Sequence, residues 1–187
     1  RDIEIIGSGS ILKDNNGNGW LPDTWDDNGG GTGSIDGHKV FDNAFVKDYL
    51  CPVTGGTVSS KYGWRDDPFG GGSEFHKGTD ISCPTGTKVL CSLDGTVIRS
   101  GWENPNNHSQ GFGQRVWVQS GDLYHVYPHL SKIDVSEGTQ VKRGTKIGEV
   151  GSTGSSTGSH FHWQLNKGGI TGETTDPAPS LKIGDKV

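Results

Sequence analysis

The sequence contains no methionine and few long aliphatic runs, which excludes a helical bundle with a Leu/Met core. Only 29% of its 187 residues are hydrophobic, and no stretch approaches the roughly 18–20 consecutive apolar residues of a membrane-spanning helix. We therefore expect no membrane span. No signal peptide is visible and the sequence begins at Arg1 rather than methionine, so we expect a processed product or a piece of a larger parent chain.

Basic residues are in the minority, with 17 Lys and Arg against 22 Asp and Glu and a net charge of -5. A protein that binds duplex nucleic acid needs a basic face to neutralise phosphates. We therefore expect no nucleic-acid partner. The charge balance says little about a neutral or mixed-charge polymer as substrate.

Cysteine is scarce and odd in number, which does not define a disulfide framework. No CxxC pair is present, so the three cysteines do not form a zinc-thiolate cluster of the usual spacing. Cys83 and Cys91 flank a turn, with Cys51 further away. They are either small buried residues or, for Cys83 and Cys91, a bridge in an oxidising compartment.

Glycine, by contrast, is abundant, with 32 residues, and it favours strands and tight turns over helices. Short apolar segments recur about every ten residues between clusters of Gly, Pro and Ser, which is typical of all-β proteins. We predict an all-β fold of mainly antiparallel sheets with few or no helices. The clearest strands are Thr87–Cys91, Thr96–Arg99, Arg115–Gln119, Tyr124–Tyr127, Lys146–Val150 and Phe161–Leu165.

Residues 1–50 differ in composition from the rest. The runs DNNGNG at 14–19 and DDNGGGTGS at 26–34 are turn and linker compositions, and Ile3–Ile6 could add an edge strand. We predict an N-terminal arm or linker over 1–50, packed loosely because it carries little apolar surface, and one folded domain over 51–187.

The arm contains half of a calcium-loop pattern. Asp14, Asn16, Asn18 and Gly19 match the first positions of D-x-[DN]-x-[DN]-G, but the twelfth position is Trp25 instead of a bidentate glutamate. A polar linker rich in turns is the favoured interpretation, and a calcium site is the alternative.

Two of the seven histidines stand in the run HFHWQL at 160–165. If this run is a strand, His160 and His162 point to one face with Gln164, and Phe161 points into the core. Two imidazoles on one strand face let one bind a metal while the other reaches a bound water or a substrate. An exposed polar strand face is the plainer alternative.

A second pattern, His76-Lys77-Gly78-Thr79-Asp80, places an imidazole and a carboxylate four residues apart, and Gly78 permits a turn between them. One His, one Asp and a further His would form the three-ligand set that catalytic zinc accepts, with a fourth position left for water. His129, in YPHLS, is either a turn histidine at a strand end or a catalytic imidazole.

Several motifs in a fixed order resemble the lysostaphin/LytM-type zinc endopeptidases, which cleave peptide bonds in bacterial peptidoglycan. The resemblance covers about residues 55–178. It is carried by YGWR (62–65), FHKGTDI (75–81), PTGTKV (84–89), DGTVI (94–98), GFGQRVWV (111–118), YPHLS (127–131), VKRGTKIGEVGSTGSSTGSHFHWQL (141–165) and DP (176–177). Pro128 and Gln114 are small departures from the usual pattern.

The resemblance implies an all-β domain with a central substrate groove and one Zn²⁺ ion per chain. His76, Asp80 and His162 correspond to the zinc ligands, and His129 and His160 to the paired catalytic histidines. His160 would accept the proton of the attacking water, and His129 would orient that water or stabilise the oxyanion.

The groove walls expected from the small-residue loops are 70–75, 101–113 and 151–159, with Trp102 and Phe112 either lining one wall or packing the loop. The resemblance predicts a peptidoglycan endopeptidase at the cell exterior, in the cell wall or on a virion. It would act as a secreted autolysin or as a wall-degrading domain of a phage tail assembly. The alternative is a non-catalytic wall-binding or regulatory module of the same fold, against which the presence of all five site residues weighs. Either a glycine bridge or a stem-peptide bond could be the one cleaved.

Overall fold

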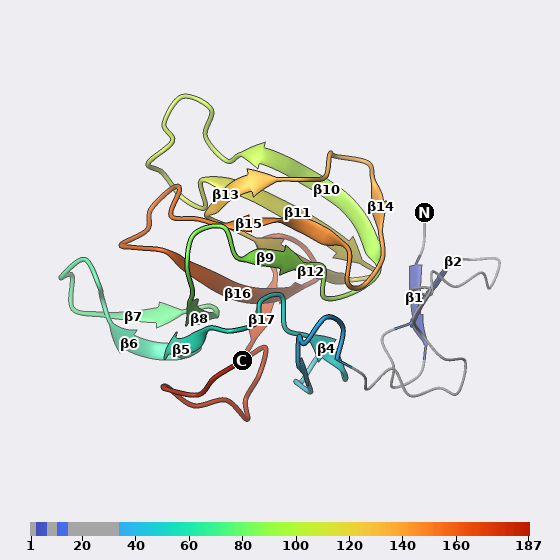
Figure 1. Ribbon diagram of the computed structural model, residues 1–187, viewed down its shortest axis with the longest axis horizontal. Coiled ribbons are helices and arrows are strands. Elements are labelled where there is room, and N and C mark those ends of the chain that lie inside the picture. Colours follow the sequence, from blue (N-terminus) through green and yellow to red (C-terminus); the bar gives the residue numbers. More distant parts are fainter. Residues whose placement is uncertain (1–2, 7–10, 15–33) are drawn as a thin grey trace.

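The computed structural model describes residues 3–6, 11–14 and 34–187, and these residues form strands joined by turns, with no helix among them. The main sheet has eight strands, all paired antiparallel (Figure 1). In spatial order they are β14 (Gln140–Val141), β10 (Gly95–Trp102), β11 (Gln114–Ser120), β12 (Leu123–Tyr127), β16 (His160–Lys167), β8 (Thr79–Ser82) and β5 (Thr57–Ser60), and β17 (Glu173–Thr175) pairs with β16.

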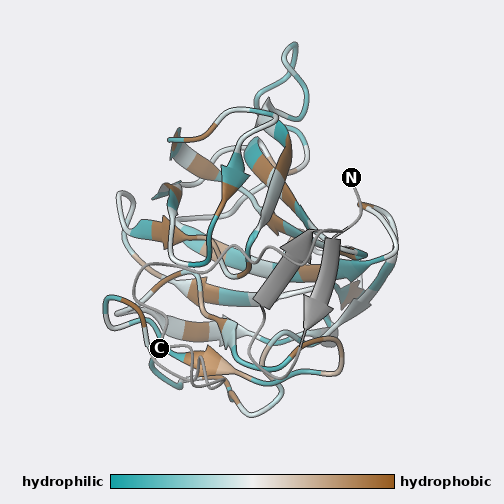
Figure 2. Cartoon of the chain, turned by 90° about the vertical axis from the view of Figure 1, so that its right-hand side faces the viewer, coloured by the Kyte–Doolittle hydropathy of each residue, from teal (hydrophilic) through white to brown (hydrophobic). Residues whose placement is uncertain are grey.

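A smaller sheet lies over one half of the main sheet, as Figure 1 shows. Its three strands are β13 (Leu130–Ile133), β15 (Lys146–Val150) and β9 (Lys88–Leu90). The hydrophobic core contains side chains from both sheets, among them Ile147 and Val89 from the smaller and Val116 and Phe161 from the larger, each fully buried. Apolar and polar residues alternate along the strands (Figure 2), which is the pattern of strands with one face on a core.

Three two-stranded ribbons complete the described structure. They are β1 (Ile3–Ile6) with β2 (Ile11–Asp14), β3 (Val40–Phe41) with β4 (Tyr49–Leu50), and β6 (Gly63–Asp66) with β7 (Ser73–His76). The all-β prediction is confirmed, and each strand named from the sequence coincides with an observed strand to within a few residues. In the described part of the chain, no helix is long and apolar enough to cross a membrane.

The expectation of a loosely packed arm is wrong for the part of it that the structure describes in detail, residues 34–50. Tyr49 and Leu50 are buried, with 1% and 0% of their surface exposed, and Tyr49 stacks on Trp163 at 5.6 Å between ring centroids. The buried His38 ring donates from Nδ1 to the carbonyl oxygen of Cys51 at 2.9 Å. A few apolar side chains in a polar segment are therefore enough to attach it to the core.

Most of the calcium-loop pattern lies outside the described residues. Asn16 and Asn18 fall there, and Asp14 is described only as the last residue of β2.

The disulfide considered for Cys83 and Cys91 is not formed, because all three cysteines are free and buried. Burial raises the pKa of the Cys51 and Cys91 thiols to about 12, so these groups stay protonated at neutral pH and behave as small apolar side chains.

One buried carboxyl group predicts an unusual pH dependence of stability. Asp94 is fully buried; its Oδ1 accepts a hydrogen bond from the Arg143 backbone N–H at 2.7 Å, and its Oδ2 has no partner. Burial raises the pKa of Asp94 to about 7, against the opposing effects of that hydrogen bond and of the Lys142 and Arg143 charges. The folded protein thus retains a proton that the unfolded chain releases near its ordinary pKa of about 4.

It follows that the contribution of Asp94 to the free energy of unfolding falls as pH rises from about 4 to about 7. At about 1.4 kcal/mol per pH unit, the loss between pH 5 and pH 8 is roughly 2–3 kcal/mol. We expect Asp94→Asn, which keeps an acceptor for the Arg143 N–H, to reduce this loss. Urea unfolding of both proteins at pH 5 and pH 8 measures the difference, and equal pH dependence in the two would contradict the prediction.

Candidate functional site

Strand β16 presents two different faces, as the alternation in HFHWQL predicts. Phe161, Trp163 and Leu165 are at most 1% exposed and belong to the core. His160 and His162 lie on the opposite face, which borders a cavity. Side chains on one face of β16 therefore pack in the core, and those on the other face border the cavity.

Strand pairing brings the other pattern to the same place. In the register of β16 with β8, His162 stands opposite Asp80, and His76 ends β7 just before the turn into β8. Gly78 lies in this turn, and a Cβ built there would come within 2.5 Å of the Trp163 carbonyl oxygen and 2.8 Å of the His162 ring. The turn can therefore approach β16 this closely because residue 78 is glycine.

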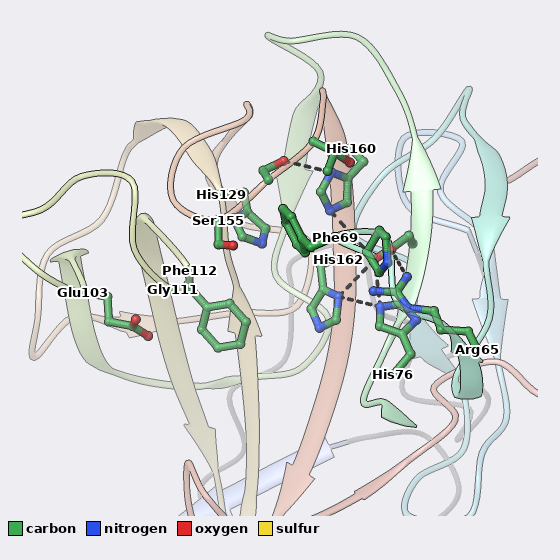
Figure 3. Close-up of a pocket in the computed structure, with 14 residues that line it drawn as sticks. Arg65, Phe69, His76, Glu103, Gly111, Phe112, His129, Ser155, His160 and His162 are labelled. Carbon is green, nitrogen blue, oxygen red and sulfur yellow. Dashed lines mark hydrogen bonds and ion pairs between the residues drawn. The ribbon is translucent and has the colours of Figure 1, made fainter. Parts of the chain in front are cut away.

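Three donor atoms converge where these elements meet (Figure 3). His76 Nε2 lies 3.2 Å from His162 Nδ1 and 3.2 Å from Asp80 Oδ1, and His162 Nδ1 lies 2.9 Å from Asp80 Oδ1. Ligands of a tetrahedral ion with bonds of about 2.0–2.1 Å stand roughly 3.3 Å apart, so the observed triangle has nearly the size of one face of a zinc tetrahedron.

The outer nitrogen of each ligand histidine is held by an oxygen that can only accept a hydrogen bond. His76 Nδ1–H donates to the Lys61 carbonyl oxygen at 2.9 Å. This tautomer leaves the lone pair of His76 Nε2 directed at the convergence point. In His162 the partner of Nε2 likewise leaves the lone pair of Nδ1 directed at that point. Two lone pairs and a carboxylate then face one another, an arrangement that a cation stabilises.

The partner of His162 is the start of a chain of side chains along the same face of β16. Asn166 Nδ2 donates to the carbonyl oxygens of Ile170 and Gly172 at 3.2 and 3.4 Å, so its Oδ1 must face Gln164. Gln164 Nε2 donates to that oxygen at 2.9 Å, and its Oε1 accepts from His162 Nε2–H at 2.7 Å. Two backbone carbonyls therefore set the tautomer of a ligand candidate through two amides.

Arg65 holds the second oxygen of the carboxylate. Its Nη1 donates to Asp80 Oδ2 at 3.1 Å, and its Nη2 pairs with Glu74 at 2.7 Å. Burial acts to raise the pKa of Asp80, but the contacts and charges of His162 and His76 outweigh it and hold that pKa well below its usual range. Asp80 is thus an ionised carboxylate with only Oδ1 directed at the convergence point.

His129 and His160 complete the group of imidazoles, with their ring centroids 5.3 Å apart. His129 Nδ1–H donates to the Thr153 carbonyl oxygen at 2.6 Å, and His160 Nδ1–H to that of Gly158 at 2.8 Å. In the neutral form of each ring Nε2 is therefore the acceptor, and His160 Nε2 lies 3.9 Å from Asp80 Oδ1. Burial lowers the pKa of His129 to about 4, so this ring is neutral at pH 7.

A cavity of about 350 Å³ opens over these rings, and a second one of about 210 Å³ adjoins it. The two share Asp80, Thr157 and His160, so together they form a groove that crosses the convergence point. The walls of the first cavity come from the β6–β7 turn (Pro68, Phe69), from loop 101–113 (Glu103, Gly111, Phe112) and from loop 151–159 (Ser155, Ser156, Thr157).

Two of the three predicted walls, 101–113 and 151–159, line the cavity, but no residue of the third, 70–75, does. The wall from the β6–β7 turn is made by Pro68 and Phe69, just before the predicted range of 70–75. Phe112 lines the cavity, whereas Trp102 stacks on His108 at 3.6 Å between ring centroids and packs its loop. Loops 101–113 and 151–159 form one continuous wall, because Ser155 N–H donates to the Gly111 carbonyl oxygen at 2.8 Å.

The structure brings together all five site residues named from the sequence around one cavity. Sequence reasoning missed the roles of Arg65, Glu103 and Asn166. The only signal for Asn166 was the continued alternation after His162, since residues two and four further along a strand share its face. Arg65 comes from β6, and nothing local indicates that it reaches the site, whereas Glu103 lies in the predicted wall 101–113 but was not singled out.

These observations define a class, that of antiparallel β domains with a groove over a His/Asp/His cluster that could hold a metal ion. The sequence model described as "Peptidase family M23" matches residues 74–177, and the chain belongs to this family.

Named relatives agree with this assignment. The glycyl-glycine endopeptidase ALE-1 of Staphylococcus capitis is 37% identical over 124 residues, which cover 65% of this chain and 33% of that protein. The peptidoglycan DD-endopeptidase ShyA of Vibrio cholerae is 44% identical over 91 residues, 48% of this chain and 20% of that protein. The chain therefore spans between a fifth and a third of the length of these two relatives.

Among solved structures, a mutant catalytic domain of the prophage-encoded M23 protein EnpA from Enterococcus faecalis is similar to this chain. Its TM-score is 0.56 at 35% sequence identity, and the match covers 66% of this chain and 89% of that domain. The β architecture described above is thus the M23 fold.

The amide chain behind His162 predicts a loss of metal affinity without loss of a ligand. Gln164→Met keeps the approximate size of the side chain but removes the acceptor for His162 Nε2–H. We expect metal affinity to fall roughly 10–100-fold, the usual effect of losing such a partner. Competition with a chromophoric chelator measures this.

Gln119→Met is the matched control, since Gln119 lies on β11 outside the cavity lining and its amide donates to the Gly121 carbonyl oxygen at 3.1 Å. If both variants bound metal as tightly as the parent protein, Gln164 would have no influence on the metal ligand.

Proposed function

We propose that this chain is a zinc-dependent endopeptidase that hydrolyses peptide bonds of bacterial peptidoglycan. One observation carries the proposal: three electron-pair donors converge in a groove where two further imidazoles, each with Nε2 available as an acceptor, face the same space. Family membership and the names of the relatives support the reaction class and the substrate. A single ligand triad alone would support metal binding but not catalysis.

The residues present fit zinc. Two imidazole nitrogens and one carboxylate oxygen form a ligand set typical of catalytic zinc, and their spacing matches its bond lengths. His76, Asp80 and His162 would hold the ion. When bound, Zn²⁺ supplies Lewis acidity that lowers the pKa of a ligand water and polarises a peptide carbonyl.

The two other histidines would handle protons. His160 is proposed as the general base that accepts the proton of the attacking water at Nε2, since Gly158 fixes its Nδ1–H. The neutral His129 would accept a hydrogen bond from that water at Nε2 and orient it, and a proton taken up from solvent would be needed before the ring could stabilise the developing oxyanion. His160, which then carries the proton of the water, would return it to the departing amine, so the cycle needs no glutamate.

The groove would hold the substrate as an extended chain with one arm in each cavity. The larger arm is bounded by Phe112 and Glu103, and the smaller is lined by hydroxyl-bearing residues such as Ser59, Ser82 and Ser159. The scissile bond would lie where the cavities join, next to His160. Such placement fixes the reacting groups relative to one another, which contributes a large part of the rate of enzymes.

The proposed place of action is outside the cytoplasm, in the cell wall, as a secreted autolysin or as a wall-degrading domain carried by a phage particle. EnpA, which is similar to this chain, is encoded by a prophage, and this supports the second context.

Digestion of purified walls tests the proposal. Walls of known cross-link type, one with glycine bridges and one with direct stem-peptide links, are incubated with the chain, and soluble products are identified by mass. We expect new amine ends in one of the two, loss of activity after chelation, and recovery after zinc is added back. Tight zinc binding without products from either wall would instead identify a non-catalytic wall-binding or regulatory module.

A further inference from the structure

We propose that Glu103 is a specificity-determining residue that binds a primary ammonium group of the substrate peptide. The inference rests on the proposed function and adds a chemical requirement to one arm of the groove. Figure 3 shows Glu103 across the cavity from Arg65 and His76, beyond the ring of Phe112.

Glu103 is an exposed residue whose backbone is fixed and whose carboxylate has room at the cavity wall. Its backbone N–H donates to the Gly113 carbonyl oxygen at 2.8 Å, which fixes the start of loop 101–113. The carboxylate lies directly against Gly111, where a Cβ would come within 1.5 Å of Glu103 Oε2. Because residue 111 has no side chain, the carboxylate can occupy this position at the cavity wall.

The Glu103 carboxylate has no partner of its own. Among the described residues, no hydrogen bond or ion pair involves its side chain, although Arg115 attracts it at longer range and donates its own Nη1–H to the Gly101 carbonyl oxygen at 3.1 Å. The other acid in the cavity lining, Asp80, faces the histidines and Arg65. Glu103 is thus the charge in this cavity wall that a substrate can neutralise.

The opposite end of the cavity differs. Arg65 there is already paired with both Asp80 and Glu74, at 3.1 and 2.7 Å, so it attracts a substrate carboxylate weakly. The groove therefore offers an anionic contact on the Phe112 side without a matching free cation on the other. A peptide with an ammonium group on that arm gains an ion pair that its acetylated counterpart lacks.

Matched peptides test the inference. The cleaved sequence is first identified from wall digests, and synthetic versions are made in which a lysine replaces one residue at a time on either side of the scissile bond. Each is assayed with its amine free and acetylated. At one position we expect a roughly two- to fivefold higher kcat/KM for the free amine, the size of an exposed ion pair. This preference should shrink as salt screens the pair.

Glu103→Gln should abolish the preference, so that the variant cleaves the free-amine and the acetylated peptide with equal kcat/KM. Glu103→Lys should reverse it, in favour of a succinylated amine. Glu137→Gln is the control, since Glu137 also acts on Arg115 but lies outside the cavity lining, and it should retain the preference. The inference fails if the parent enzyme ignores acetylation at every position or if Glu103→Gln keeps the preference. Failure of the parent to release products from any wall would instead overturn the proposed function.

Discussion

Replacing His162 with alanine is expected to remove the metal and the activity together. The substitution deletes one of three donor atoms that lie within 3.2 Å of one another, and two remaining ligands hold zinc far more weakly. We expect metal-free protein after mild chelation that leaves the parent loaded, and no measurable wall digestion. Metal content by mass spectrometry, measured beside wall digestion, gives both results on one sample.

His108→Ala is the matched control, because His108 is an exposed histidine that stacks on Trp102 and lies outside the cavity lining. It should keep both zinc and activity. A His162→Ala protein that retained zinc after chelation would show that His162 is not a ligand, and thermal unfolding curves would exclude a simple loss of fold.

Replacing His160 with alanine should leave the metal in place and slow turnover. His160 shares a strand face with His162, but its Nε2 lies 3.9 Å from Asp80 Oδ1 and outside the triangle of ligands. Loss of a general base typically costs about 10²–10⁴ in rate, so we expect kcat to fall by that factor with unchanged zinc content. If His160→Ala lost zinc and His162→Ala kept it, the two roles would be reversed.

The role of His129 can be tested in the same way, but the replacing residue must tolerate the backbone conformation at this position. Its backbone φ of +56° is in the left-handed region, which asparagine tolerates better than alanine does. His129→Asn should therefore keep the turn and the metal while losing rate, as His160→Ala does. Zinc content and kcat are measured for His162→Ala, His160→Ala and His129→Asn. Loss of zinc identifies a metal ligand, and loss of rate with zinc retained identifies a proton carrier. If His129→Asn kept the full rate, His129 would have no part in the mechanism.

The features of the site that could be predicted from the sequence depend only on residues close together in the chain. The alternation in HFHWQL determines which residues of β16 face the core, because strand side chains repeat every two residues whatever the strand pairs with. Glycine at 78 likewise predicts a close turn between His76 and Asp80. The strands themselves followed from apolar runs between turn residues. For His129 and His160, residue chemistry alone allowed more than one role. The resemblance to lysostaphin/LytM-type endopeptidases, based on the order of the motifs, then assigned them the role of catalytic histidines.

Only the tertiary structure decided the rest, because it depends on segments far apart in the chain. His162 meets Asp80 across 82 residues, and the strand register, which no local pattern reveals, places them opposite each other. Burial of Tyr49 and Leu50 attaches part of the expected arm to the core, and Cys83 and Cys91 are buried free thiols. The amino-acid sequence by itself determined which donor groups this protein has. Packing determined which oxygen holds each imidazole, since that geometry exists only when distant strands and loops are joined.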